Sequence, residues 1–171
     1  TIDTLDYSGD GINSGSKVVI AAVGPAKYQL LEREVAIPDH ASKCVMPGVL
    51  AVKSAPFTNY STVEQDIAKL EAAVSAVNMD GIRLIILCDD PSFLAAHLNN
   101  FLWETFTRSN PAADIHGIDA FTQQKHWGCR GPLIIDARRK PHHAPDLIKD
   151  ASVEARVDRL GLEGASLYGI I

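Results

Sequence analysis

Apolar runs and amphipathic segments alternate along the middle of this chain, and this alternation restricts the possible folds more than any other feature. Ile82 to Cys88 (IRLIILC) is a continuous apolar run, typical of a strand buried on both faces. Before it, apolar residues at spacings of three and four predict a helix over Thr62 to Met79, with Ser61 and Glu64 as its capping box. After it, Asp89-Asp90-Pro91 supplies the cap and first-turn proline of a further helix.

Further strands and helices are expected on both sides of this region. Strands are predicted at Lys17–Val23, Val49–Lys53, Ile115–Ile118 and Leu133–Asp136, and helices from Pro25 to about Val35 and from Ser152 to Leu160. Strands that are separated by helices need crossover connections. The sequence therefore predicts an α/β fold of three layers, in which a mainly parallel sheet has helices on both faces, as in Rossmann- or flavodoxin-like domains.

Polar residues follow several of the predicted strands. In sheets of this type, ligands bind beyond the carboxyl ends of the strands. We therefore expect Asp89, Asp90, Asp136, Arg138 and the loop from Asp119 to Arg130 to lie near one edge of the sheet.

Length and composition favour a single domain. The chain has 171 residues, of which 46% are hydrophobic, and domains commonly contain about 100–200 residues. We predict one α/β domain over residues 1–171, with residues 1–16, rich in glycine, serine and aspartate, as its lead-in.

Charge and cysteine content exclude several classes of protein. The formal net charge is −5 and the basic residues are scattered, so the sequence lacks the basic face of a nucleic-acid-binding protein. No apolar run approaches the roughly 20 residues that cross a bilayer, and the first residues lack a signal segment. The three cysteines, Cys44, Cys88 and Cys129, are far apart and favour a reducing compartment. We therefore expect a cytoplasmic protein that binds neither membrane nor nucleic acid.

Three possible sites are weak. The glycine-rich residues 9–17 (GDGINSGSK) could wrap a phosphate, but they precede a strand, which favours a tight turn. Asp89 and Asp90 could act as a carboxylate pair, but helix capping explains them better. The spacing of His126, Cys129, His142 and His143 matches no usual zinc pattern. The sequence therefore gives no catalytic residue and no metal ligand.

The sharpest local signal is the turn TRSNPAAD. The helix before it must end ahead of Pro111, because proline disfavours helical geometry in the preceding residue. Arg108, Asn110 and Asp114 are predicted to build this turn, with Arg108 paired to Asp114 across it. Substrate binding by the same residues stays open as the alternative.

These residues also carry a family likeness. DDPSFLAAHLNNFLWETFTRSNPAADIH, followed by GPLIIDARRK, resembles the carboxy-terminal domain of the UbiD-type aromatic-acid decarboxylases and carboxylases, which use prenylated FMN. The motifs are a strand ending in acidic residues, a helix with Trp103, a TR-x-x-P turn, and a DA-x-x-K-like segment ending at Lys140. The segments GDGINSGSK and MPGVLAV are similar to members near the phenol and hydroxybenzoate (de)carboxylases.

The resemblance implies a part of a carboxy-lyase that is not catalytic alone. In this family the prenylated FMN, its divalent metal and the reacting side chains come from other parts of a longer chain, so this chain alone is expected to bind no cofactor. The carboxy-terminal domain dimerises, and its loop after the turn borders the substrate pocket. By position, Phe121, Lys125, His126 and Trp127 are then the residues expected to face an aromatic acid. The alternative is that Phe121 and Trp127 pin the loop to its own domain.

The implied partners are a larger UbiD-like flavin-binding chain or segment and further copies of this chain, in a dimer or a higher homo-oligomer. A different class of function also fits the sequence. The chain could be a stand-alone α/β protein that binds a small molecule or nucleotide at the edge of its sheet.

Overall fold

The computed structural model describes residues 2–3, 17–21, 23–144 and 150–170. The chain forms two compact units, Thr1–Pro141 and His142–Ile171, which are described separately below. The prediction of one domain over residues 1–171 stays a prediction.

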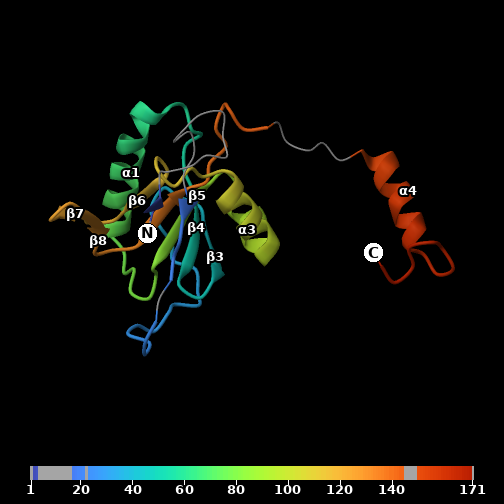
Figure 1. The fold of residues 1–171 in the computed structure, drawn as a ribbon, viewed down its shortest axis with the longest axis horizontal. Coiled ribbons are helices and arrows are strands. Elements are labelled where there is room, and N and C mark those ends of the chain that lie inside the picture. Colours follow the sequence, from blue (N-terminus) through green and yellow to red (C-terminus); the bar gives the residue numbers. More distant parts are fainter. Residues whose placement is uncertain (1, 4–16, 22, 145–149, 171) are drawn as a thin grey trace. The chain divides into compact units, whose positions relative to one another are not determined.

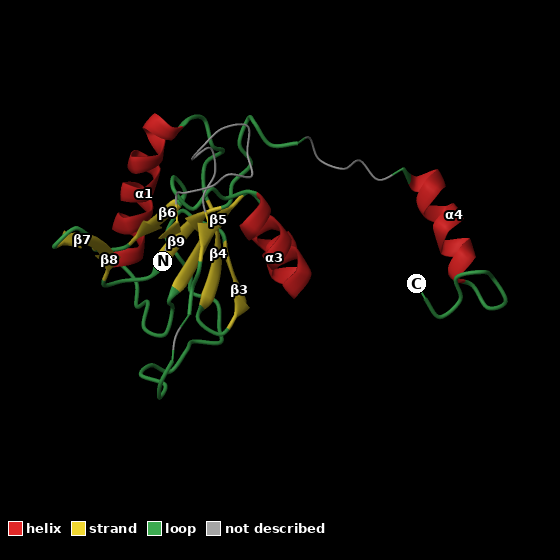
Figure 2. Cartoon of the chain, viewed as in Figure 1, coloured by secondary structure: helices red, strands yellow, loops and turns green. Residues whose placement is uncertain are grey.

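The first unit is built on a mixed five-stranded sheet (Figures 1 and 2), with the strand order β3-β4-β5-β9-β6. The three central strands are parallel, and each edge strand is antiparallel to its neighbour. The strands are β3 (Ser42–Met46), β4 (Val49–Lys53), β5 (Leu84–Cys88), β6 (Ile115–Gly117) and β9 (Leu133–Asp136). The predicted α/β class and the strands at residues 49–53, 84–88, 115–117 and 133–136 are thereby confirmed.

Helices cover both faces of this sheet (Figure 1). Helix α1 (Tyr60–Ser75) packs Leu70 and Val74 against one set of strand residues. Helices α2 (Pro91–Ala96) and α3 (Leu98–Thr107) contribute Leu94 and Phe101 to the core on the other face. A Rossmann- or flavodoxin-like arrangement in the finer sense stays a prediction.

The strand residues alternate between these two cores because successive side chains of a strand point to opposite faces. In β5, Ile85 and Leu87 join the α1 side, whereas Ile86 and Cys88 join the side of α2 and α3. All four are completely buried. Burying one large aliphatic side chain contributes about 1.5–3 kcal/mol, so the two cores fix the sheet between its helices.

Two of the predicted helix starts can be checked. Asp90 caps α2 as predicted, since its Oδ1 accepts hydrogen bonds from the backbone N–H groups of Ser92 and Phe93. The predicted capping box of α1 is wrong, because the N-cap is Asn59, whose side chain accepts from the Ser61 N–H. The helix after Asp90 also divides in two at His97, which is extended (φ −149°, ψ 146°).

The segment before the sheet differs from the prediction. Among the described residues of the predicted strand over 17–23, only Lys17–Val18 form a strand (β2), and it pairs with β1 (Ile2–Asp3) outside the main sheet. Val19, Ile20 and Val23 are exposed, because no strand of the main sheet covers them. An apolar run without a neighbouring strand is not a core strand.

The helix predicted from Pro25 to Val35 is also wrong. This segment is irregular, and its backbone bonds to two turns instead of to itself. The Leu31 N–H donates to the Gly81 carbonyl at 3.1 Å, and the Gly48 N–H donates to the Leu31 carbonyl at 2.8 Å. The backbone of this segment therefore forms hydrogen bonds with distant residues instead of the local hydrogen bonds of a helix.

The predicted polar loop is a β-hairpin of β7 (Ala120–Gln123) and β8 (His126–Cys129), seen beside α1 in Figure 2. Its two-residue turn has positive φ at Gln124 (50°) and Lys125 (68°). Two left-handed residues are the signature of a type I′ turn, whose twist matches that of the strands. That turn normally carries Asn and Gly, so Gln-Lys concealed the hairpin in the sequence.

The second unit contains one helix, α4 (Ala151–Gly161), close to the prediction for residues 152–160. Asp150 caps it by accepting hydrogen bonds from the Ser152 and Val153 N–H groups. None of its residues is buried within the described part of the chain. Among the described residues, no helix combines the length and the apolar composition that crossing a membrane requires.

Candidate functional site at the carboxyl end of the parallel strands

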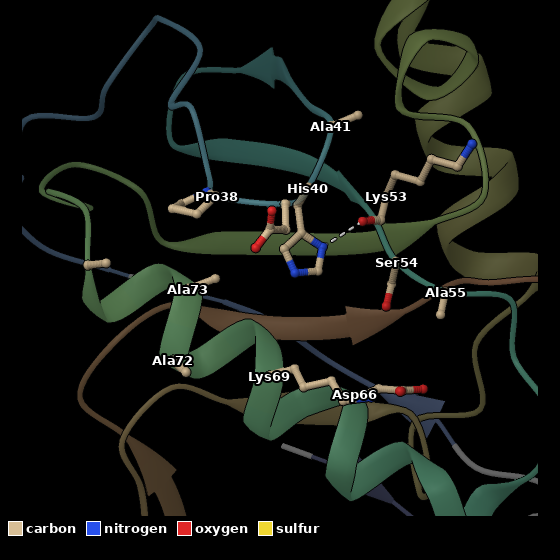
Figure 3. A pocket seen from close by; sticks show the side chains of 12 residues that line it. Pro38, His40, Ala41, Lys53, Ser54, Ala55, Asp66, Lys69, Ala72 and Ala73 are labelled. Atoms are coloured by element: carbon tan, nitrogen blue, oxygen red, sulfur yellow. Dashed lines mark hydrogen bonds between the residues drawn. The ribbon is translucent and has the colours of Figure 1, made fainter.

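A cavity of about 790 Å³ lies at the carboxyl end of β4 (Figure 3). Three segments line it: residues 38–41 before β3, residues 53–55 at the end of β4, and one face of α1. The α1 residues are Asp66, Lys69, Ala72 and Ala73, and Ala76 is the C-cap of this helix. Since β3 runs antiparallel to β4, its beginning meets the end of β4, which brings the first two segments together.

A backbone hydrogen bond orients the side chain of His40 in this cavity. Its Nδ1 lies 2.9 Å from the backbone carbonyl oxygen of Lys53. A carbonyl oxygen can only accept, so Nδ1 donates its proton to it, and in the neutral tautomer that carries this proton Nε2 is an acceptor. The hydrogen bond thus fixes both the tautomer and the orientation of the imidazole.

Asp66 is held from behind by a buried arginine. The Arg138 side chain is fully buried, and its Nη1 donates to Asp66 Oδ2 at 2.8 Å and to the Ala55 carbonyl at 2.8 Å. Its Nε and Nη2 donate to the two carboxylate oxygens of Asp136, at 2.9 and 2.7 Å. Burial alone would lower the pKa of Arg138, but the hydrogen bonds to Asp136 and Asp66 raise it above its usual value. One guanidinium therefore fixes two parts of the cavity wall.

A second buried cation lies beside this arginine. Lys140 Nζ donates to the backbone carbonyls of Asp136 (2.8 Å) and Arg108 (3.0 Å) and lies 3.3 Å from Asp114 Oδ2. Burial raises the pKa of Asp114, although the N–H of Asn110 and the charge of Lys140 oppose this shift. Buried charges persist only when they are paired, and here Lys140 joins β9 to the turn after α3.

Three further ionisable groups surround this network. Burial lowers the pKa of His116, against the opposing charges of Asp136 and Asp114. Burial also raises the pKa of Glu104, against the opposing charge of Arg108. Tyr60 has a raised pKa because of burial and the neighbouring Asp114. None of these three side chains lines the cavity.

The predicted turn residues lie together after α3, but their pairing differs from the expected one. Arg108 Nη1 lies 3.2 Å from Glu104 Oε1 and 3.6 Å from Asp89 Oδ2. Asp114 instead pairs with Lys140 and accepts a hydrogen bond from the Asn110 N–H. Arg108 and Asp114 are thus each paired with other residues instead of with each other.

The predicted substrate loop lies at the other end of the sheet. Gly117, just before the hairpin, pairs with Leu133 at the start of β9, whereas Asp136 ends that strand. The prediction that residues 119–130 share an edge with Asp89 and Asp136 is therefore wrong, because β6 runs antiparallel to β9. Phe121, Lys125, His126 and Trp127 are all on the hairpin, and none of them lines the cavity.

The aromatic residues of the hairpin have different surroundings. The Phe121 ring lies against Gly128, and the Arg130 guanidinium is 4.9 Å from its centroid. Trp127 is 46% exposed. Arg130 and Asp119 form an exposed ion pair at 3.2 Å, and the Asp119 N–H donates to Glu71 on α1. The base of the hairpin is therefore anchored to α1.

The remaining candidate sites from the sequence concern metal binding, phosphate binding and the cysteines. Within residues 2–3, 17–21, 23–144 and 150–170, no group of three or more His, Cys, Asp or Glu side chains could hold a metal ion. The glycine-rich residues 9–16, considered above as a phosphate loop, lie outside the described residues. The cysteines at 44, 88 and 129 are free thiols.

Comparison with known proteins identifies similar sequences. No family model matches the chain. It is 29% identical to a protein of Chlamydia pneumoniae that is named as one of the subunits of 4-hydroxybenzoate decarboxylase, over 91% of this chain and 26% of that protein. It is 30% identical to an uncharacterised protein of Chlamydia trachomatis (89% of this chain, 25% of that protein) and 28% identical to one of Chlamydia caviae (91% and 26%). The chain thus spans about a quarter of the length of these relatives.

Two solved structures show weaker likeness. Both are of the vanillic acid decarboxylase of Sedimentibacter hydroxybenzoicus in its open form, at 16% identity. One covers 72% of this chain and 29% of that chain with a TM-score of 0.43; the other covers 65% and 26% with a TM-score of 0.41. The sequence comparison is in line with the resemblance drawn from the motifs: the chain is similar to a quarter of a protein that is named as part of a decarboxylase.

Proposed function

We propose that this chain is the carboxy-terminal domain or small subunit of a UbiD-like carboxy-lyase that acts on an aromatic hydroxy acid. In this role it assembles protomers and borders the substrate pocket. The proposal rests on the 29% identity, over 91% of the chain, to the relative that is named as part of 4-hydroxybenzoate decarboxylase.

The proposal assigns prenylated FMN and its divalent metal to the flavin-binding chain or segment. The described residues do not fit the metal, because they bring no three ligand side chains together. The buried carboxylates of Asp114 and Asp136 are already engaged by Lys140 and Arg138. The proposal therefore assigns decarboxylation to the assembled enzyme and not to this chain alone.

The hairpin is proposed to border the substrate pocket of the complete enzyme. Trp127 offers an exposed ring, and Lys125 and His126 stand beside it on the turn and the second strand. An aromatic acid needs an apolar face for its ring and a cation for its carboxylate. Ring stacking contributes about 0.5–1.5 kcal/mol beyond burial, and Phe121 supports the hairpin from the first strand.

Helix α3 is proposed to carry the assembly surface. Leu98, Leu102 and Phe106 are about half exposed and lie at spacings of four on one side of the helix, with Trp103 next to them. Exposed apolar patches of this kind mark interaction sites. A further copy of the chain or the flavin-binding partner would cover them.

Two half-exposed tryptophans make a matched test of these roles. The measurement is CO2 release from 4-hydroxybenzoate by the complex of this chain with its flavin-binding partner. Trp127→Ala should raise KM severalfold, whereas Trp103→Ala, at a similarly exposed site on α3, should weaken assembly and leave the KM of intact complexes unchanged. Absence of CO2 release from the unmodified complex, or equal effects of both substitutions on KM, would contradict the proposal.

A further inference from the structure

The geometry points to the cavity between α1 and the end of β4 as a binding site for an uncharged aromatic ring that donates a hydrogen bond through N–H or O–H. This site is separate from the hairpin and does not depend on the proposed function. Four features carry the inference: its size and position, the acceptor of His40, the balance of charge, and the alanine surface of α1.

Size and position both suit a small molecule. The cavity volume of about 790 Å³ lies in the usual range of ligand pockets, roughly 300–1,000 Å³. The cavity also lies outside the carboxyl end of β4, one of three parallel strands. Ligands of α/β sheets bind at this end of the strands.

His40 supplies the hydrogen-bond acceptor. In Figure 3 its imidazole and the side chain of Ser54 point into the space beside α1. Because Nδ1 is committed to the Lys53 carbonyl, Nε2 is left to accept from a ligand. A ligand with only acceptors would leave this nitrogen unpaired, so the site selects for a donor.

The charges around the cavity cancel. Lys53 and Lys69 are balanced by Asp39 and Asp66 among the lining residues. Arg138, which supports Asp66 from behind, is itself paired with Asp136. A phosphate or polyanion would need an excess of cationic groups, which is absent from the lining. The ligand class is therefore uncharged.

Three alanines form the apolar part of the α1 side of the cavity, next to Asp66 and Lys69. Ala72 and Ala73 lie near the end of α1 and Ala76 caps it, and Figure 3 shows Ala73 on the side of the helix toward His40. Small side chains leave room for a ring, and apolar area removed from water stabilises it there. A larger side chain at Ala72 would fill this space.

The test uses indole and 1-methylindole, which share a ring system and differ in the N–H donor. The full chain is labelled in its histidine rings, and the dissociation constant of each probe is measured from the NMR shift of the His40 ring. Indole should bind saturably, and 1-methylindole should bind about tenfold more weakly or worse, because Nε2 loses its partner. Equal affinities for the two probes, or no saturable shift, would overturn the inference.

Two alanine variants locate the site. Ala72→Leu should weaken indole binding about tenfold, as expected for a side chain that occupies the ligand volume. Ala68→Leu, one turn away on the same helix and outside the lining, should leave the affinity within about twofold and serves as the folding control. If the two variants behave alike, the cavity is not the site. Since the assay uses neither flavin nor decarboxylation, its failure is distinguishable from failure of the proposed function.

Discussion

Replacing Arg138 tests the buried network that supports the candidate site. Arg138→Met keeps the length of the side chain but removes four hydrogen bonds: two to Asp136, one to Asp66 and one to the Ala55 carbonyl. Asp136 is fully buried, so its carboxylate would lose the charge with which it is paired. Breaking a buried pair in this way typically costs about 3–5 kcal/mol.

An exposed arginine provides the matched control. Arg130 pairs with Asp119 at 3.2 Å, with both side chains more than half exposed. Arg130→Met should cost less than about 1 kcal/mol, because solvent screens exposed ion pairs. The two variants are compared by urea denaturation followed by circular dichroism, with the free energy of unfolding taken from the midpoint and slope.

A double variant separates the charge effect from lost packing. Adding Asp136→Asn to Arg138→Met removes the unpaired charge, so the double variant should be more stable than the sum of the two single losses implies. Equal losses in Arg138→Met and Arg130→Met would refute this reasoning.

Three further predictions concern a cap, a turn and a titrating group. Asp90→Ala should lower the free energy of unfolding by about 1 kcal/mol, measured by urea denaturation, because two N–H groups of α2 lose their acceptor; an unchanged midpoint would contradict the capping role. Lys125→Gly should raise that free energy by about 0.5 kcal/mol by relieving a positive φ, whereas Gln123→Gly, within β7, should lower it; the reverse order would argue against a type I′ turn. Because burial lowers the pKa of His116, the unfolded chain binds more protons below about pH 6.5 and the folded state loses stability there. His116→Gln should reduce this loss in denaturation series from pH 7 to 5, and an identical pH profile would show that another group titrates.

The sequence predicted those helices and strands in which the apolar residues follow a clear pattern. Helix α1 and strands β4, β5 and β9 have buried apolar residues at helical spacing or in continuous runs, and both signals depend on local sequence alone. The hairpin was missed because its turn uses Gln124 and Lys125 in a conformation that usually requires Asn and Gly. The antiparallel direction of β6 was missed because the direction of a strand in a sheet depends on its pairing with residues distant in sequence.

The candidate site was harder to predict for the same reason. His40, Lys53 and Ala72 come from three segments, and none of them belongs to a recognisable motif. Only the antiparallel pairing of β3 with β4 brings the first two together. The burial of Arg138 and Lys140 also has no local sequence signal: charged residues are normally exposed, whereas here both are buried by pairing with Asp136 and Asp114.

The most direct test of the account is CO2 release from 4-hydroxybenzoate by the purified chain, with and without its flavin-binding partner, combined with light scattering and a flavin absorbance spectrum. The account predicts release only when the partner is present, and a chain that alone carries no flavin and forms a dimer or larger oligomer. Turnover by the isolated chain with its own bound flavin, or no release from the assembled complex, would contradict it.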